Sequence, residues 1–86
     1  MRYKQRDNLT VQSVDDETLI LDINGNNIHQ LNATASFIWG LCEDAVSMEQ
    51  LTDLFAERYE IEQATAKRDV ENVINQLSEM GLIIAA

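Results

Sequence analysis

The stretch that decides the fold is LNATASFIWGLCED, which runs from Leu31 to Asp44. Polar and apolar residues alternate before it, and apolar residues recur at helical spacing within and after it. Asn32 stands in the position of a helix N-cap, immediately before Ala33, a strong helix former. The helix that follows is expected to end near Asp44 and to carry Ile38 and Trp39 on its apolar face. The stretch therefore predicts the junction between a β-sheet and the first helix.

Three short strands are predicted before this junction. Residues 8–14 alternate polar and apolar side chains, and residues 28–31 form a short returning segment. Between them, residues 17–23 divide into two faces. The first face carries Leu19, Leu21 and Ile23, and the second carries Thr18, Ile20 and Asp22. Asp15-Asp16 makes a short turn, and the run from Asn24 to Asn27 is the strongest hairpin signal in the chain. The segment therefore predicts a meander of three antiparallel strands.

Two further helices are predicted after the stretch. Ser47 and Gln50 match a capping box, which opens a helix of about twelve residues. Its apolar stripe consists of Leu51, Leu54, Phe55 and Tyr59. A longer helix is expected from about Glu62 to Met80, and Gly81 stands where such a helix ends. Its apolar stripe consists of Ala66, Val70, Val73, Ile74, Leu77 and Met80.

Strands followed by helices place the chain in the α+β class. A three-stranded antiparallel β-meander followed by three α-helices is winged helix-turn-helix-like. The apolar residues 82–84 are expected to pack back on this body as a stub strand. The chain of 86 residues is predicted to form a single domain, 1–86, with residues 1–7 as a flexible basic arm.

The charge of the chain separates it from nucleic-acid-binding proteins of similar architecture. The formal net charge is −9, and the segment from Asp7 to Glu57 holds ten acids without one Lys or Arg. Such a surface repels phosphate backbones and anionic lipid, so we expect neither nucleic acid nor a membrane as a partner. The acids can attract a basic partner or serve solubility alone. The sequence has no signal peptide and no apolar run of about 18 residues, which predicts a cytoplasmic protein.

The residues that could carry chemistry do not form a reactive group. Cys42 lies on the apolar face of the first helix, where a small buried side chain is the usual role. His29 is the only histidine and is expected to pack across strands. One His and one Cys far apart give no metal-ligand spacing. We therefore expect no catalytic residue, no metal ion and no cofactor.

The deciding stretch resembles the signature of the PqqD-like family. The matching residues are Leu31, Asn32, Ala35, Ile38, Trp39, Leu41, Cys42, Glu43 and Asp44. Further matches are Leu51, Leu54 and Tyr59 in the second helix and Leu77, Gly81 and Leu82 around the end of the third. The chain departs from the family pattern at Ala45, because Gly often follows the acidic residue there. The likeness extends from about Leu9 to Ile84.

The resemblance implies a non-catalytic domain that recognises the leader of a ribosomally made precursor peptide. Such a RiPP recognition element holds the leader as an added strand and presents it to a modifying enzyme, such as a radical SAM enzyme, a cyclase or a leader peptidase. Two other classes stay open: a divergent winged-helix transcriptional regulator, and a scaffold or dimerisation module. The sequence is compatible with a monomer and with a dimer.

The resemblance also implies where the peptide binds, between the edge of the third strand and the third helix. An unpaired strand edge recruits an extended peptide through main-chain hydrogen bonds. The predicted edge residues are Ile28, His29, Gln30 and Leu31. The predicted helix wall is drawn from Lys67, Arg68, Val70, Glu71 and Ile74. Lys67 and Arg68 would then pair with an acidic residue of the leader.

Overall fold

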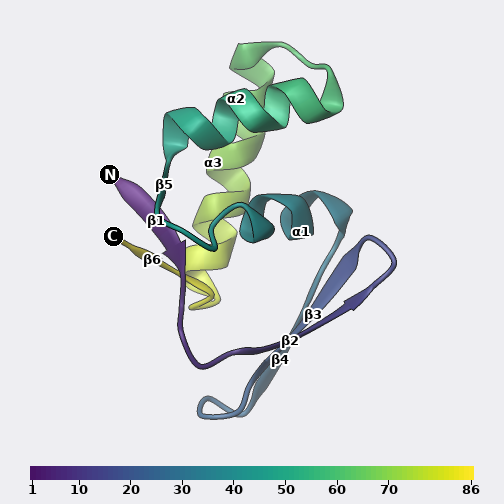
Figure 1. Cartoon of the computed structure of the whole chain (residues 1–86), viewed down its shortest axis with the longest axis vertical. Coiled ribbons are helices and arrows are strands. Elements are labelled where there is room, and N and C mark those ends of the chain that lie inside the picture. Colours follow the sequence, from purple (N-terminus) through teal and green to yellow (C-terminus); the bar gives the residue numbers. More distant parts are fainter.

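The structure, a computed structural model, describes all 86 residues as two small antiparallel sheets beside three helices (Figure 1). One sheet contains, in spatial order, β2 (Thr10–Val14), β3 (Glu17–Asp22) and β4 (Asn27–Leu31). The other contains β5 (Val46–Ser47), β1 (Arg2–Gln5) and β6 (Ile83–Ala85). The helices are α1 (Ala33–Gly40), α2 (Met48–Tyr59) and α3 (Gln63–Glu79). The predicted α+β class and the winged helix-turn-helix-like order, a β-meander followed by three helices, are confirmed.

The β2–β3–β4 sheet is a local meander with both predicted turns in place. Asp15 occupies the first turn and Asn26 the second, each with a φ of 55°. Asp and Asn tolerate this left-handed region better than most residues do. Ile20 of β3 lies opposite Val11 of β2 and His29 of β4. Side chains directly opposite one another share a face of a sheet, so these three point the same way.

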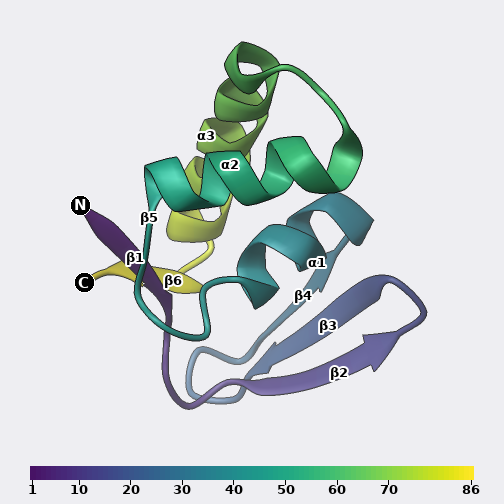
Figure 2. The ribbon, with the colours of Figure 1, turned by 45° about the horizontal axis from the view of Figure 1, so that its top comes forward.

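That face of the sheet is turned toward the helices. Thr18, Ile20 and Leu31 are buried on it, and α1 packs against β3 and β4 (Figure 2). Leu19 and Leu21 point to the opposite side and do not join the core cluster. The sheet therefore buries the less apolar face of β3 and leaves the more apolar face outside.

The prediction of a flexible arm at residues 1–7 is wrong, because β1 is the central strand of the second sheet. Tyr3 and Gln5 are half-buried on one side of β1, and Gln5 Nε2 donates a 2.8 Å hydrogen bond to the Trp39 carbonyl. Arg2 pairs with Ser47, while Tyr3 pairs with Val46 and with Ala85. These partners come from distant parts of the chain, so the sequence around residues 1–7 gave no sign of a strand. Only its basic charge was apparent.

The first two helices begin at the capping residues that the sequence indicated. At the start of α1, the Asn32 side chain accepts a 2.9 Å hydrogen bond from the Ala35 N–H. At the start of α2, Ser47 and Gln50 form the complete capping box. Each cap satisfies N–H groups that the first turn of a helix leaves without a partner.

The helix ends differ in how well the sequence indicated them. Gly81, with a φ of 73°, ends α3 as predicted, and its N–H donates to the Ser78 carbonyl. The first helix ends at Gly40, before the predicted end at Asp44. The Cys42 carbonyl accepts a 2.8 Å hydrogen bond from the Gln5 N–H, so the chain leaves the helix to meet β1.

The core brings the three helices together with both sheets. It consists of Ile20, Leu31, Ile38, Trp39, Cys42, Val46, Leu51, Phe55, Ala66, Val70, Ile74, Leu77, Leu82 and Ile83. Trp39 is buried as predicted, and its Nε1–H donates a 3.0 Å hydrogen bond to the Leu82 carbonyl. Two residues of the predicted apolar stripes lie largely outside: Leu54 is 43% exposed and Met80 is 40% exposed.

Candidate functional site

The strand β4 is one edge of the meander. It pairs with β3 and with no other strand, so one side of its backbone has no partner within the sheet. An edge of this kind offers N–H and C=O groups to an incoming extended chain. The predicted edge residues Ile28, His29, Gln30 and Leu31 all lie on β4. The strand β2 forms the other edge of the same sheet.

The strand register indicates which backbone groups point away from the sheet. Val14 and Glu17 flank the two-residue turn between β2 and β3, and this is the pair that a turn joins by its closing hydrogen bond. Hydrogen-bonded and non-bonded pairs alternate along an antiparallel ladder. The backbone N–H and C=O groups of Leu19 and Leu21 therefore form their hydrogen bonds with β2, and those of Ile20 form theirs with β4.

Two residues on each edge consequently have outward-facing backbone groups. On β4 these are Ile28 and Gln30, which lie opposite Leu21 and Leu19. On β2 they are Val11 and Ser13, which lie opposite Ile20 and Thr18. The two pairs are matched positions on the two edges of one sheet.

The side chains of β4 alternate between the two faces of the sheet. Ile28 is 67% exposed on the outer face, where Gln30 Nε2 also donates a 2.9 Å hydrogen bond to Glu17 Oε1. His29 and Leu31 point toward the helices, and Leu31 is buried. The His29 Nε2 atom is buried without a hydrogen-bond partner. A peptide added beside β4 would thus place every second side chain on the helix side of the sheet, next to His29.

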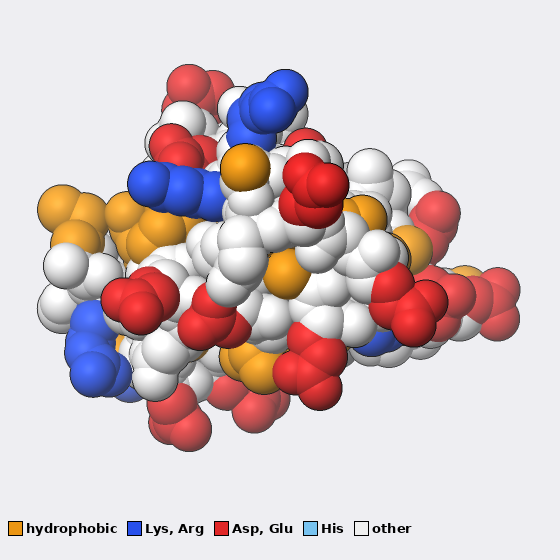
Figure 3. All heavy atoms as spheres, turned by 90° about the horizontal axis from the view of Figure 1, so that it is seen from above, with side chains coloured by type: hydrophobic (Ala, Val, Ile, Leu, Met, Phe, Trp, Pro, Cys, Tyr) orange, Lys and Arg blue, Asp and Glu red, His pale blue; other side chains and the backbone are white.

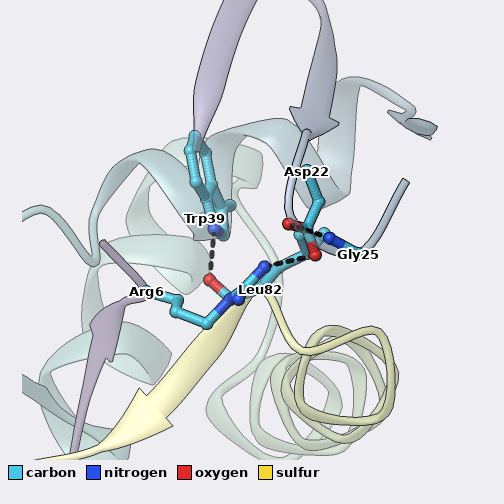
Figure 4. A network of polar contacts seen from close by, with 5 residues as sticks. All are labelled: Arg6, Asp22, Gly25, Trp39 and Leu82. Carbon is cyan, nitrogen blue, oxygen red and sulfur yellow. Dashed lines mark hydrogen bonds and ion pairs between the residues drawn. The ribbon is translucent and has the colours of Figure 1, made fainter. Parts of the chain in front are cut away.

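A polar contact fixes the far end of the β3–β4 hairpin to the second sheet (Figure 4). The Asp22 carboxylate accepts the Gly25 N–H at 3.1 Å and contacts Arg6 Nη2 at 2.5 Å. The hydrogen bond from Gly25 and the adjacent Arg6 guanidinium hold the pKa of Asp22 below its usual value. Gly25 is constrained here, since a Cβ on it would lie 2.7 Å from Asp22 Oδ2.

The predicted helix wall on α3 divides into buried and exposed residues. Val70 and Ile74 belong to the core and have almost no exposed surface, so they offer a peptide nothing to contact in this conformation. Arg68 and Glu71 are exposed. Lys67 lines a hollow of about 590 Å³ that α3 shares with α2. The two basic residues of α3 therefore do not lie together beside β4.

The other flank of α3 was not among the residues named from the sequence. Counting 100° per residue from the buried Val70, Lys67 and Glu71 fall on one flank, and Asp69, Val73 and Gln76 fall on the other. Asp69 and Val73 are half-buried. The first flank is turned toward α2 at Lys67, so the second is turned away from α2.

The one cysteine has the environment of a structural residue. Cys42 is fully buried, and its Sγ lies 3.4 Å from the Ile38 carbonyl, to which the thiol donates. Burial raises the pKa of the thiol to about 11, so the reactive thiolate is scarce at neutral pH. No group of three or more His, Cys, Asp or Glu residues is placed to hold a metal ion.

Acidic side chains are distributed over the molecular surface. Figure 3 shows them scattered across the face seen from above, while the basic side chains there form no continuous patch. The strands and turns of the meander carry only acidic charges, because no Lys or Arg occurs between Asp7 and Glu57. This surface is unsuited to a nucleic-acid backbone. None of the helices has the length and apolar character needed to cross a bilayer.

Among known proteins, a family model gives the family of the chain and three solved structures share its fold. The family model for coenzyme PQQ synthesis protein D (PqqD) matches residues 17–83. The solved structure of TbiB1 in complex with the TbiA(beta) leader peptide is 25% identical, covers 96% of each chain and has a TM-score of 0.85. A lasso peptide synthetase B1 complexed with the leader peptide is 26% identical, covers 98% of this chain and 99% of its own, and has a TM-score of 0.82.

A third structure shows the fold alone. It is the PqqD truncation of Methylobacterium extorquens PqqCD, described as a functional and stand-alone RiPP recognition element. It is 10% identical, covers 96% of this chain and 88% of its own, and has a TM-score of 0.76. No curated protein sequence matches the chain. The family model nevertheless spans most of the sequence, from β3 to the start of β6, and on that ground the chain belongs to the PqqD family.

Proposed function

We propose that this chain binds the leader of a precursor peptide as an added strand on the β4 edge. The observation that carries the proposal is the free edge of β4, combined with membership of the PqqD family. Two relatives of the same fold are complexed with leader peptides. Ile28 and Gln30 would exchange main-chain hydrogen bonds with the peptide, and these bonds would supply affinity for any extended sequence.

The helix side of the added strand would supply selectivity. A peptide beside β4 has His29 on its inner side, and we propose that its next neighbour is the flank of α3 with Asp69, Val73 and Gln76. Val73 gives this flank a partly exposed apolar side chain. This assignment replaces the wall predicted from the sequence, because Val70 and Ile74 are core residues and Lys67 lies beside α2.

The proposed role is recognition without catalysis, in partnership with an enzyme that modifies the precursor. Cys42 and His29 lack the acid–base partners that a nucleophile or general base needs. A bound leader would instead be held in one extended conformation while the rest of the precursor reaches the enzyme. Whether that enzyme is a radical SAM enzyme, a cyclase or a leader peptidase depends on the precursor, and each is compatible with this proposal.

The test is a titration of the labelled protein with synthetic leaders, taken from short precursor-like reading frames beside the gene. Backbone amide signals should shift in Ile28–Leu31 and in residues 69–76 of α3. Shifts centred on Leu51–Tyr59, with both of those segments silent, would place the site elsewhere. If none of the leaders shifts any amide, leader binding itself is contradicted.

A second titration tests regulation of transcription as the alternative function. Short duplex DNA at low salt gives a basic winged-helix domain its best conditions for binding. We expect no shift up to high micromolar DNA, because the meander carries no positive charge. Saturable micromolar binding would overturn the exclusion of nucleic acid.

A further inference from the structure

The outer face of the β2–β3–β4 sheet carries a group of apolar side chains that no other element covers. Five residues define this outer patch: Val14, Leu19, Leu21, Ile23 and Ile28. Val14, Ile23 and Ile28 are 57%, 75% and 67% exposed, and Leu19 and Leu21 are half-exposed between them. None of the five contributes to the core cluster. Scattered single apolar residues are normal on a surface, but a contiguous group on one sheet face indicates an interaction site.

The surface of the outer patch is not flat. Two hollows of about 220 Å³ each open on it, one beside Leu21 and Ile28 and the other beside Val14 and Leu19. A protruding side chain of a partner can enter such a hollow, whereas a flat apolar surface offers only area. The patch therefore has room for protruding side chains of a partner.

The charges around the outer patch restrict what can cover it. Glu17 stands on this face, and Asp15 and Asp16 lie at the adjoining turn. The meander contains no Lys or Arg that could neutralise these acids. The nearby Arg6 already forms an ion pair with Asp22 at the end of the β3–β4 hairpin. The meander of a second copy offers no Lys or Arg to these acids, and an anionic membrane would be repelled. A partner with an apolar centre and Lys or Arg at its rim matches both features.

We infer that the outer patch docks a second protein whose contact face is apolar with a basic rim, while the leader occupies the β4 edge. This inference rests on the proposed function, because the two surfaces are continuous. Ile28 and Gln30 belong to the edge through their backbone and to the outer face through their side chains. A strand added beside β4 would extend the outer face by one strand and display every second leader side chain on it. The docked protein would then contact the sheet and the bound leader together.

The test uses a probe that reproduces the chemistry of the inferred partner. The probe is an amphipathic helical peptide with Leu on one face and Lys along its rim, and a matched peptide carries Glu in place of Lys. A helix avoids strand addition at either edge and suits packing on a sheet face. The Lys peptide should shift the amides of the outer patch, and the Glu peptide should bind at least tenfold more weakly.

Two variants tie the binding to the patch. Leu21→Gln and, independently, Val14→Thr change partly exposed side chains that make no core contact, so both proteins should fold. Each should weaken binding of the Lys peptide at least fivefold and leave leader binding unchanged. Unchanged binding of the Lys peptide to both variants would overturn the inference, because the peptide would then be reporting acidic surface elsewhere.

Two further outcomes would overturn the inference. Sedimentation that shows self-association at micromolar protein, abolished by Leu21→Gln, would assign the patch to a second copy. Binding to vesicles of anionic phospholipid, abolished by the same variant, would assign it to a membrane. A monomer that ignores the vesicles supports the inferred partner. The leader titration is a separate measurement, so its failure would remove the proposed function without deciding what covers the patch.

Discussion

The two edges of the meander, β2 and β4, are alike in backbone and differ in their surroundings. Val11 and Ser13 on β2 present the same outward N–H and C=O groups as Ile28 and Gln30 on β4. On the helix side, however, Val11 is 45% exposed and Ser13 is exposed, whereas Leu31 of β4 is buried and His29 is half-buried. A peptide on β2 would thus gain backbone hydrogen bonds alone. A peptide on β4 would gain the same bonds and a packed side, which is where sequence selectivity arises.

The largest expected effect is a loss of stability from a substitution in the core, which supports both edges of the meander. Trp39→Ala deletes the indole from the core and the hydrogen bond to the Leu82 carbonyl. Loss of a buried aromatic side chain should lower the free energy of unfolding by about 3–5 kcal/mol, which is a large share of the stability of so small a domain. Urea denaturation followed by tryptophan-independent circular dichroism measures this loss. A Trp39→Ala protein that stays folded and loses only leader binding would show that Trp39 contacts the ligand.

The second prediction separates the two edges directly. Gln30→Pro and Ser13→Pro each remove one outward N–H, from β4 and β2 respectively, and proline is tolerated where an edge N–H faces solvent. Gln30→Pro should weaken leader binding at least tenfold, because a main-chain bond is lost and the ring obstructs the edge. Ser13→Pro should leave the affinity unchanged. Gln30→Ala, which keeps the N–H, is the control for the side-chain contact with Glu17, and calorimetric titration provides the affinities.

Much of the fold could be predicted from local residue patterns. Asn32, the Ser47–Gln50 box and Gly81 obey rules that span three or four residues, and each was found in its predicted role. β1 was missed because its partners, β5 and β6, are distant in the chain. The burial of Ile20 in preference to Leu19 and Leu21 was equally hidden, since alternation defines two faces without saying which one meets the helices.

The helix wall of the site shows the same limit of sequence reasoning. The 3.6-residue period identifies the buried stripe of α3 centred on Val70, but it leaves two flanks of similar polarity. The wall implied by the family resemblance took Lys67, Arg68, Val70, Glu71 and Ile74 together, without separating the buried stripe from a flank. The position of α2, which depends on contacts throughout the core, places Lys67 beside that helix and is the reason for proposing the other flank. Short turns predict the strand order, whereas the choice of the β4 edge over the β2 edge came from the resemblance to the PqqD-like family.

The third prediction concerns the contact between Asp22 and Arg6 at the end of the β3–β4 hairpin. Because the pKa of Asp22 is lowered in the folded state, its ionised form contributes stability at pH values above the usual carboxyl range. This contribution is lost as the pH falls through the lowered pKa of the folded protein. Asp22→Asn should therefore reduce stability at neutral pH and flatten the loss of stability below about pH 4. Thermal unfolding between pH 2 and pH 7 measures both effects, and Glu43→Gln, which removes an exposed acid without an ion-pair partner, is the control.

The smallest expected effect distinguishes the two flanks of α3. Asp69→Asn should weaken the binding of a leader that carries a basic residue beside Asp69. The loss should be up to about fivefold, since a partly exposed ion pair contributes about 0–1 kcal/mol. The difference should vanish as salt is raised. Glu71→Gln, on the flank turned toward α2, should have no effect. If Lys67→Glu instead weakens binding of an acidic leader while Asp69→Asn is silent, the wall predicted from the sequence is correct.

The most direct measurement of strand addition at β4 is residue-resolved amide hydrogen exchange with and without leader peptide. Outward N–H groups on a free edge exchange quickly, and a paired strand protects them. If the leader adds to β4, Ile28 and Gln30 should become protected in the complex while Val11 and Ser13 exchange as before. Protection of Val11 and Ser13, or a saturated complex in which none of these four amides slows, would contradict it.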